Sequence, residues 1–348
     1  MNRRSQRQPG TTTPPPAAAP EATDVALDIR GLRVAFGDAT VVEGLDLTVR
    51  RGEILALVGE SGSGKSVTAR AAMGLLPSGA RITGGSVTLD GEDLVGLAPR
   101  RMDRIRGSRV AMLFQQPRAM LDPTATVRDQ VAEPLWLHRG LSRREARRRV
   151  PGLLRDVGIP EPERRARAYA HQLSGGMAQR VMIAAALAGD PGLLIADEPT
   201  TALDVTVQAQ ILRLLKRRQR ESGMSVLLIT HDLGIVATTA DRVAVMYAGR
   251  IVEDGPVAEL FESPRHPYTQ ALLRASLLRR EADRLYTIPG SAARARELRR
   301  GCRFRPRCPV ADGTDVAGSC ENEEPTLSSC GSGHRCRCWA RPAEAVGG

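Results

Sequence analysis

The stretch Gly59-Glu-Ser-Gly-Ser-Gly-Lys65-Ser66 carries the residue types that bind phosphate. It reads G-x-x-x-x-G-K-S and follows the apolar, strand-like run Ile54-Leu-Ala-Leu-Val58. Small residues let successive backbone N–H groups face an anion, and the positive end of the next helix faces the same anion. Lysine and serine then supply a charge for the β- and γ-phosphates and a hydroxyl for Mg²⁺. The predicted nucleotide-binding residues of this loop are Gly59, Ser61, Gly62, Ser63, Gly64, Lys65, Ser66 and Val67.

Two carboxylates end a second apolar run, Leu193-Leu-Ile-Ala-Asp197-Glu198. Because side chains alternate along a strand, the two acids project differently. One of them can hold Mg²⁺ opposite Ser66, and we assign this role to Asp197. Glu198 is then placed to polarise an attacking water, so that it joins Lys65 among the predicted catalytic residues.

A Ser-Gly-Gly turn opens a helical run that reaches to about Ala188. It predicts a second anion site at a helix N-terminus, formed by Ser174, Gly175 and Gly176. With this element the chain resembles the ATP-binding cassette (ABC) ATPases, whose signature reads L-S-G-G-x. The resemblance implies ATP and Mg²⁺ as cofactors. It also implies a head-to-tail dimer in which the signature of one subunit faces the nucleotide on the P-loop of the other.

Further elements of the same family follow in order. Gln115, in Phe114-Gln-Gln-Pro117, matches the Q-loop that links nucleotide to the transmembrane partner, and Gln116 is the alternative. The resemblance makes Gln115 a catalytic, nucleotide-binding and Mg²⁺-binding residue. His231, in Ile229-Thr-His-Asp232, matches the switch histidine that contacts the γ-phosphate, and it is the fourth predicted catalytic residue.

Two more nucleotide contacts rest on the resemblance. Phe36 occupies the position of the aromatic side chain that stacks on adenine, and Asp204 belongs to a D-loop that has Thr201 where Ser is commoner. Met177 replaces the commoner Gln of the signature, which we do not expect to inactivate the site. The resemblance covers about residues 25–280, and we predict an active ATPase.

The composition of the chain limits which partners it could bind and where in the cell it could lie. The 348 residues are 42% hydrophobic and carry a net charge of +11, with basic clusters at 100–109, 139–167 and 294–307. Such charge suits nucleic acid, an anionic membrane surface or an acidic partner, but 3% aromatic residues disfavour stacking platforms for single-stranded nucleic acid. No stretch approaches 18 apolar residues, and the N-terminus has no signal-peptide core. We expect a peripheral protein on the cytoplasmic face of the cell membrane.

The predicted architecture is α/β: a P-loop NTPase of the ABC cassette type, with a mixed sheet core, an antiparallel β subdomain and a helical subdomain. Residues 1–23 are rich in Pro, Thr and Ala and are expected to be disordered. Residues 24–280 form the cassette, with a helical insert at about 117–172 that includes a capping box at Ser142. Residues 281–348 form a small, separately held domain that contains all six cysteines.

Four segments are similar to one subgroup, the ATPase subunits of peptide, oligopeptide and nickel importers. They are Arg265-His-Pro-Tyr-Thr-Gln-Ala-Leu-Leu-Arg274, Leu173-Ser-Gly-Gly-Met-Ala-Gln-Arg180, Ala202-Leu-Asp-Val-Thr-Val-Gln-Ala-Gln210 and the tail that begins Gly301-Cys-Arg-Phe-Arg-Pro-Arg-Cys-Pro309. The resemblance implies a subunit that binds and hydrolyses ATP to power import of a peptide or a related solute such as a nickel chelate. Its implied partners are two transmembrane permeases, a second and paralogous ATPase and, indirectly, a solute-binding protein, without nucleic acid.

The subgroup's tail commonly holds a 4Fe-4S cluster on four cysteines. The best fit here is Cys302, Cys308, Cys320 and Cys338, and Cys336 is an alternative to Cys338. The same thiolates suit structural zinc, and an unmetallated tail stays a third possibility. Cys330 has no assigned role.

Two other functions compete with the importer subunit. The first is a soluble ABC ATPase that acts on nucleic acid or ribosomes, which the basic charge favours. Translation factors of that kind carry two cassettes, whereas this chain has one P-loop and one signature. The second is a degenerate cassette that only binds ATP, against which the intact Lys65, Asp197, Glu198 and His231 argue.

Overall fold

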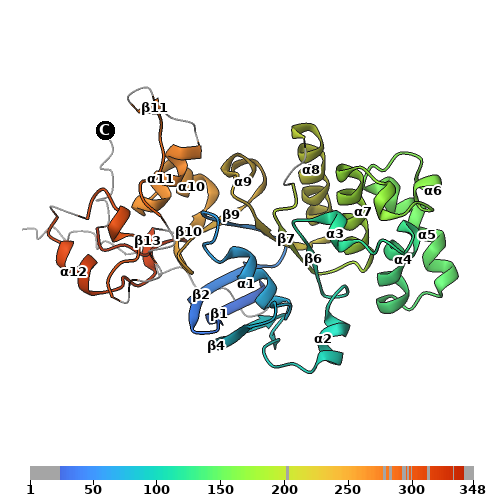
Figure 1. Ribbon diagram of the computed structural model, residues 1–348, viewed down its shortest axis with the longest axis horizontal. Helices are drawn as coiled ribbons and strands as arrows, with labels where there is room; N and C mark the ends of the chain where they lie inside the picture. The colour runs from blue at the N-terminus through green and yellow to red at the C-terminus, as the bar shows by residue number, and fades with distance from the viewer. Residues whose placement is uncertain are drawn as a thin grey trace, which may run out of the picture.

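The computed structural model describes residues 24–200, 204–276, 280–281, 284–291, 295, 298, 300–311, 314–331 and 333–340. Within them a central sheet is flanked by helices and by a second, antiparallel sheet (Figure 1). A group of helices lies at one end of the molecule and the cysteine-rich segment at the other. The predicted disordered tail, residues 1–23, lies outside the described residues.

The central sheet has eight strands in the order β13-β14-β10-β9-β3-β8-β7-β6. The five strands from β9 to β6 are parallel, in a register that pairs Ile54 with Val226 and Leu194 with Val226, and β10 returns antiparallel to β9. The bounds of these strands are β3 (Ile54–Val58), β6 (Val110–Leu113), β7 (Leu193–Asp197), β8 (Ser225–Ile229), β9 (Arg242–Tyr247) and β10 (Arg250–Pro256). Parallel neighbours bring their carboxyl ends to one edge of the sheet, where ligands of open α/β sheets bind.

Both faces of the central sheet are covered. Alternate strand residues such as Leu57 pack with α1 and the antiparallel sheet, and the others, such as Leu194, pack with α7 and α8. At β9 the covering helices are α9, α10 and α11. Burial on both faces explains why these strands are apolar throughout. The bounds of these helices are α1 (Lys65–Ala72), α7 (Gly175–Ala188), α8 (Val205–Ser222), α9 (Leu233–Thr239), α10 (Val257–Glu262) and α11 (Pro267–Ser276).

The antiparallel sheet has the order β2-β1-β4-β5. Its strands are β1 (Val25–Phe36), β2 (Ala39–Arg50), β4 (Ala80–Leu89) and β5 (Glu92–Asp93). The alternating run at Leu45–Val49 lies within β2, which pairs antiparallel with β1. Residues of β1, β2 and β4 share one buried cluster with α1, which joins this sheet to the core.

The segment between β6 and β7 is mainly helical. It contains α3 (Pro117–Met120), α4 (Val127–His138), α5 (Arg143–Asp156), α6 (Pro162–Arg165) and the 3-10 turn Ala170–Gln172, and α2 (Pro99–Ile105) precedes β6. The predicted capping box is present: Ser142 accepts a hydrogen bond from the backbone N–H of Glu145, whose carboxylate accepts from that of Ser142. Ala146, Val150 and Leu154 are buried on one face of α5.

Helix α1, which follows the phosphate-binding loop, is short. It ends at Ala72, because Gly74 has a left-handed backbone (φ +61°). The guanidinium of Arg106 then donates to the carbonyls of Met73 (2.9 Å) and Gly74 (2.8 Å). A distant side chain thus satisfies the end of this helix, which periodicity alone does not reveal.

The cysteine-rich segment, which we expected to be held separately, pairs with the central sheet. Strand β14 (His334–Cys336) pairs antiparallel with β10 and carries β13 (Ser328–Gly331) at the edge of the central sheet. The segment extends the core because β10 offers an edge that another strand can pair. The remaining elements are β11 (Arg280–Glu281), β12 (Arg284–Leu285), the 3-10 turn Arg305–Arg307 and α12 (Ala317–Asn322). No helix in the described part of the chain is long and apolar enough to span a bilayer.

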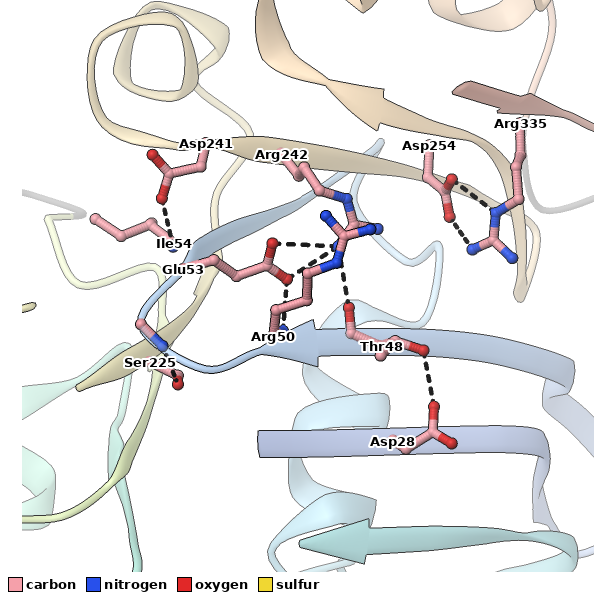
Figure 2. Close-up of polar contacts among 11 residues, drawn as sticks. Asp28, Thr48, Arg50, Glu53, Ile54, Ser225, Asp241, Arg242, Asp254 and Arg335 are labelled. Atoms are coloured by element: carbon pink, nitrogen blue, oxygen red, sulfur yellow. Dashed lines mark hydrogen bonds and ion pairs between the residues drawn. The ribbon is translucent and has the colours of Figure 1, made fainter. Parts of the chain in front are cut away.

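A buried ion pair joins the two sheets at the start of β3 (Figure 2). The Glu53 carboxylate accepts from the Arg242 guanidinium at 2.9 Å and from the backbone N–H of Arg50 at 2.6 Å. Arg242 also donates to the carbonyl of Thr48 in β2, at 3.3 Å. Because Glu53 is 8% exposed, its charge depends on these donors.

We expect Arg242→Leu to lower the free energy of unfolding by about 3 kcal/mol, because it leaves the Glu53 carboxylate buried and unpaired. The matched control is Arg155→Leu, which breaks the exposed ion pair with Glu163 and should cost under about 1 kcal/mol. Urea denaturation followed by circular dichroism measures both. Equal effects of the two variants would contradict a structural role for the buried pair.

Candidate active site

The predicted phosphate-binding loop connects β3 to α1 in a glycine-dependent shape. Gly59 has φ +149°, and a Cβ atom there would collide with the carbonyl of Met246 in β9. Gly64 has φ +112° and precedes α1 without a side-chain cap. The first-turn N–H groups of α1 are therefore presented to the loop without a capping side chain, which is the arrangement that suits an anion.

Lys65 lies across this loop and is 6% exposed. Its ammonium donates to the carbonyls of Gly59 (2.7 Å) and Glu60 (2.9 Å). Burial lowers the pKa of Lys65, and the carboxylates of Glu198, Asp197 and Glu60 act in the opposite direction. The side chain is thus a buried cation whose hydrogen bonds go to the loop itself, including the Ser63 hydroxyl at 3.5 Å, and phosphate oxygens could replace these partners.

Ser66 and Asp197 meet between α1 and the end of β7. The serine hydroxyl donates to the Asp197 carboxylate at 2.9 Å. Burial raises the pKa of Asp197, as does the neighbouring Glu198, while the bond from Ser66 lowers it. Hydroxyl and carboxylate oxygens are ligands that Mg²⁺ accepts, so these two residues could hold that ion beside the loop.

The structure brings Gln115, Glu198 and His231 together. One carboxylate oxygen of Glu198 accepts from the Gln115 side-chain amide at 2.9 Å, and the other lies 3.3 Å from Nδ1 of His231. The three residues follow β6, β7 and β8, which are neighbours in the sheet. The carboxylate therefore lies between an amide and an imidazole on the same edge as the phosphate-binding loop.

The backbone of Glu198 is also unusual. Its φ of +48° is left-handed, and its N–H donates to the carbonyl of Ile229 at 2.9 Å. A non-glycine residue in this region costs on the order of 1 kcal/mol or more and persists where its surroundings fix it. Here the bond to β8 fixes the direction of the carboxylate.

The signature residues do not join this cluster within the chain. Ser174 caps α7, and its hydroxyl accepts from the N–H of Met177 at 3.2 Å, with Gly175 and Gly176 in the first turn. Figure 1 shows α7 apart from α1. Asp204 caps α8 by accepting from the N–H of Val207 at 2.9 Å. The rest of the predicted D-loop, 201–203, lies outside the described residues.

The other predicted contacts lie around the loop. Phe36 is the half-buried last residue of β1 and pairs with Ala39 and Ala80. Its sheet adjoins the loop, because the next strand, β2, brings the carbonyl of Val41 against Gly64. Ser61 and Gly62 are exposed at the tip, Ser63 is buried and accepts from the N–H of Gly249 at 2.9 Å, and Val67 packs on the core.

The sequence patterns do not reveal two residues that contact the phosphate-binding loop. Tyr268 accepts a hydrogen bond from the N–H of Glu60, and Arg307 forms an ion pair with the Glu60 carboxylate. They lie 208 and 247 positions further along the chain, so no local pattern connects them to the loop. Tyr268 belongs to a segment that resembled a family, but its role was not apparent.

The four cysteines of the predicted cluster line one small cavity. Cys302, Cys308, Cys320 and Cys338 surround a space of about 10 Å³, and Cys336 does not line it. Burial raises the pKa of the Cys302 thiol to about 12. Among the described residues, no group of three or more His, Cys, Asp and Glu side chains is arranged so that it could hold a metal ion. The four side chains are of the type that binds iron or zinc, but their arrangement in this structure is not that of a metal site.

Comparison with known proteins identifies the family. The ABC transporter family matches residues 42–201, and the oligopeptide/dipeptide transporter C-terminal region matches residues 252–314. A putative peptide import ATP-binding protein of Brucella ovis is 50% identical over 90% of this chain and 96% of its own length. The oligopeptide transport ATP-binding protein OppD of Mycobacterium bovis is 49% identical over 91% of this chain and 51% of its own length.

Solved structures agree. The ATP-binding cassette MJ0796, in a dimeric post-hydrolysis state bound to ADP and Pi, is 29% identical with a TM-score of 0.60, over 66% of this chain and 98% of its own. CbiO1 from Clostridium perfringens is 31% identical with a TM-score of 0.60, over 69% and 92%. Family, fold and site geometry lead to one conclusion: the chain belongs to the ATP-hydrolysing, ATP- and Mg²⁺-dependent subunits of ABC transporters, in the group that carries the oligopeptide/dipeptide transporter C-terminal region.

Proposed function

We propose that this chain binds and hydrolyses ATP to power an importer of dipeptides, oligopeptides or a related small solute such as a nickel chelate. The observation that carries the hydrolytic part is the contact of Glu198 with Gln115 and His231 beside the phosphate-binding loop. The solute class is supported by the match of residues 252–314 and by the printed names of the relatives.

In this proposal the site has distinct roles for its residues. Lys65 exchanges its bonds to the loop carbonyls for bonds to the β- and γ-phosphates, and Glu198 polarises the attacking water while Gln115 and His231 orient it. Ser66, Asp197 and Gln115 would hold Mg²⁺, whose charge would offset that of the phosphates. Phe36 stacks on adenine. The loop contacts to the phosphates come from Gly59, Ser61, Gly62, Ser63, Gly64 and Val67.

The signature acts in a second subunit. Ser174, Gly175 and Gly176 begin α7, and Asp204 caps α8. Because α7 lies apart from α1, the signature would meet nucleotide held by another cassette (Figure 1). The dimeric state of MJ0796 supports such a pairing. We expect the second cassette to be a paralogue of this chain.

The permeases would dock beside Gln115. A groove of about 600 Å³ lies between the core and the helical segment. Its lining includes Phe114, next to Gln115, together with Met112, Trp136 and Met182. A partner segment in this groove would move the Gln115 segment and so affect the Glu198 carboxylate. In this proposal the chain lies peripherally on the cytoplasmic face of the membrane, and a solute-binding protein acts through the permeases.

The basic surface does not by itself favour nucleic acid. Several arginines in the basic clusters pair with carboxylates of the chain, as Arg109 does with Asp90 and Arg147 with Asp129. Others are used internally, such as Arg106 at the end of α1. Local pairing of this kind reduces the charge available to an external polyanion.

For the cysteine-lined cavity we propose a 4Fe-4S cluster with a structural role, held by Cys302, Cys308, Cys320 and Cys338. The support is that all four thiols line one cavity. A cluster bound there would crosslink the segment between Cys302 and Cys338. Zinc is the alternative.

Glu198→Gln should keep ATP binding but lower ATPase activity by about 100-fold or more, because an amide cannot accept the proton of the attacking water. Turnover assays and nucleotide titration measure the two properties. Glu163→Gln, which changes a carboxylate in an exposed pair, is the control and should leave both unchanged. Near-normal turnover in Glu198→Gln would refute the role given to this residue.

Affinity purification of the tagged chain from detergent-solubilised membranes tests the importer. We expect two multi-span permeases and a second cassette ATPase by mass spectrometry, because these are the partners that the proposal assigns to the groove and to the signature. The tagged chain with Trp136→Glu, altered in the groove, should lose the permeases. Recovery of ribosomal proteins or nucleic acid without permeases would favour the competing function.

Anaerobically purified protein should be brown, with broad absorbance near ~400 nm and bound iron and sulfide. Cys320→Ser should lose the colour, whereas Cys330→Ser, outside the cavity, should keep it. Absorbance and metal analysis decide the matter. A colourless preparation that contains zinc and no iron would establish the alternative.

A further inference from the structure

Two side chains from the part of the chain that follows β10 contact the phosphate-binding loop at Glu60. Its backbone N–H donates to the hydroxyl of Tyr268 at 2.9 Å. Its carboxylate forms two parallel hydrogen bonds with the guanidinium of Arg307, at 2.9 and 3.0 Å. Both contacts come from the part of the chain that follows β10. A bidentate arginine–carboxylate pair fixes orientation as well as distance.

Arg307 is itself rigidly placed. Its side chain is 6% exposed, and its Nε donates to the carbonyl of Pro289 at 2.7 Å. A cluster of buried aromatic rings lies beneath it, in which Tyr247 packs on Tyr268 at 4.6 Å and on Phe304 at 5.2 Å between ring centroids. The guanidinium carbon lies 5.7 Å from the centre of the Tyr247 ring. Arg307 therefore transmits the position of the cysteine-rich segment to the loop.

The charge of Glu60 makes this contact relevant to nucleotide. The carbonyl of Glu60 accepts a hydrogen bond from the ammonium of Lys65. Glu60 therefore lies next to the lysine that is predicted to bind the phosphates. An unpaired carboxylate on the loop would repel a triphosphate. Arg307 neutralises that carboxylate and holds it turned toward the cysteine-rich segment.

We propose that Arg307 is a positioning residue for ATP binding, which fixes the phosphate-binding loop and neutralises its acidic residue through Glu60. The cysteine-rich segment thereby takes part in forming the nucleotide site. This inference rests on the ATP binding of the proposed function, and it does not depend on the solute or the permeases.

The rival explanation is that Arg307 merely anchors its segment. Other arginines do this without touching the loop. Arg303 donates to the carbonyl of Ala248 at 2.6 Å and pairs with Glu43, and Arg335 pairs with Asp254. They supply matched controls, because their loss weakens the same segment at other points.

The test compares Arg307→Gln with Arg303→Gln in the full chain. Arg307→Gln should weaken binding of Mg-ATP about tenfold, or about 1.4 kcal/mol, and raise KM while kcat stays within about twofold. Arg303→Gln should leave the dissociation constant within about twofold. Arg307→Lys should recover part of the affinity, because it restores the charge without the bidentate geometry.

A double variant separates charge from folding. Glu60→Gln alone should weaken binding only about threefold, and Glu60→Gln with Arg307→Gln should bind better than Arg307→Gln alone, since no unpaired carboxylate remains. Titration with a fluorescent ATP analogue measures all five variants, and Glu60→Gln stays informative where Arg307→Gln fails to fold. Wild-type affinity in Arg307→Gln, equal losses in Arg303→Gln, or additive effects in the double variant would overturn the proposal.

Discussion

The parallel register of four neighbouring strands is the constraint on which the site depends. Strands β3, β8, β7 and β6 are buried on both faces, and each ends at the same edge of the sheet. The loop after β3 and the residues after the other three strands must therefore meet there. A shift of one strand by a single residue would turn its side chains to the opposite face and separate Glu198 from Gln115 and His231.

The segment after β10 adds a second constraint by continuing the same sheet. Glu253 in β10 is fully buried and lies 2.8 Å from Nε2 of His334 in β14, and it accepts from the backbone N–H groups of Arg265 and His266. A buried carboxylate is tolerated only with such partners. It therefore ties β10, β14 and the start of α11 together. Because α11 carries Tyr268, the same network also places the hydroxyl that holds the phosphate-binding loop.

Local signals predicted the parts of this structure that depend on neighbours in sequence. The capping box at Ser142, the apolar strand that ends at Asp197 and the Gly-rich loop each depend on residues within a few positions, and all are present. Contacts across long separations were not predictable in this way. The end of α1 depends on Arg106, and the position of Glu60 depends on Arg307. A pattern of cysteines also suggested a separate domain, since composition does not show that β14 pairs with β10.

Some of the predicted site residues are fixed by contacts within the chain, and others have few such contacts. Lys65, Ser66, Asp197 and Glu198 are connected by short hydrogen bonds or electrostatic coupling within one chain. His231, by contrast, is 66% exposed on its side chain, and Ser174 caps α7, which lies apart from α1 (Figure 1). An exposed imidazole has few contacts that fix it, so closure of a second subunit would order it and exclude water in one step. Coupling hydrolysis to assembly in this manner would limit ATP consumption by an isolated subunit, which is the behaviour that a transport ATPase requires.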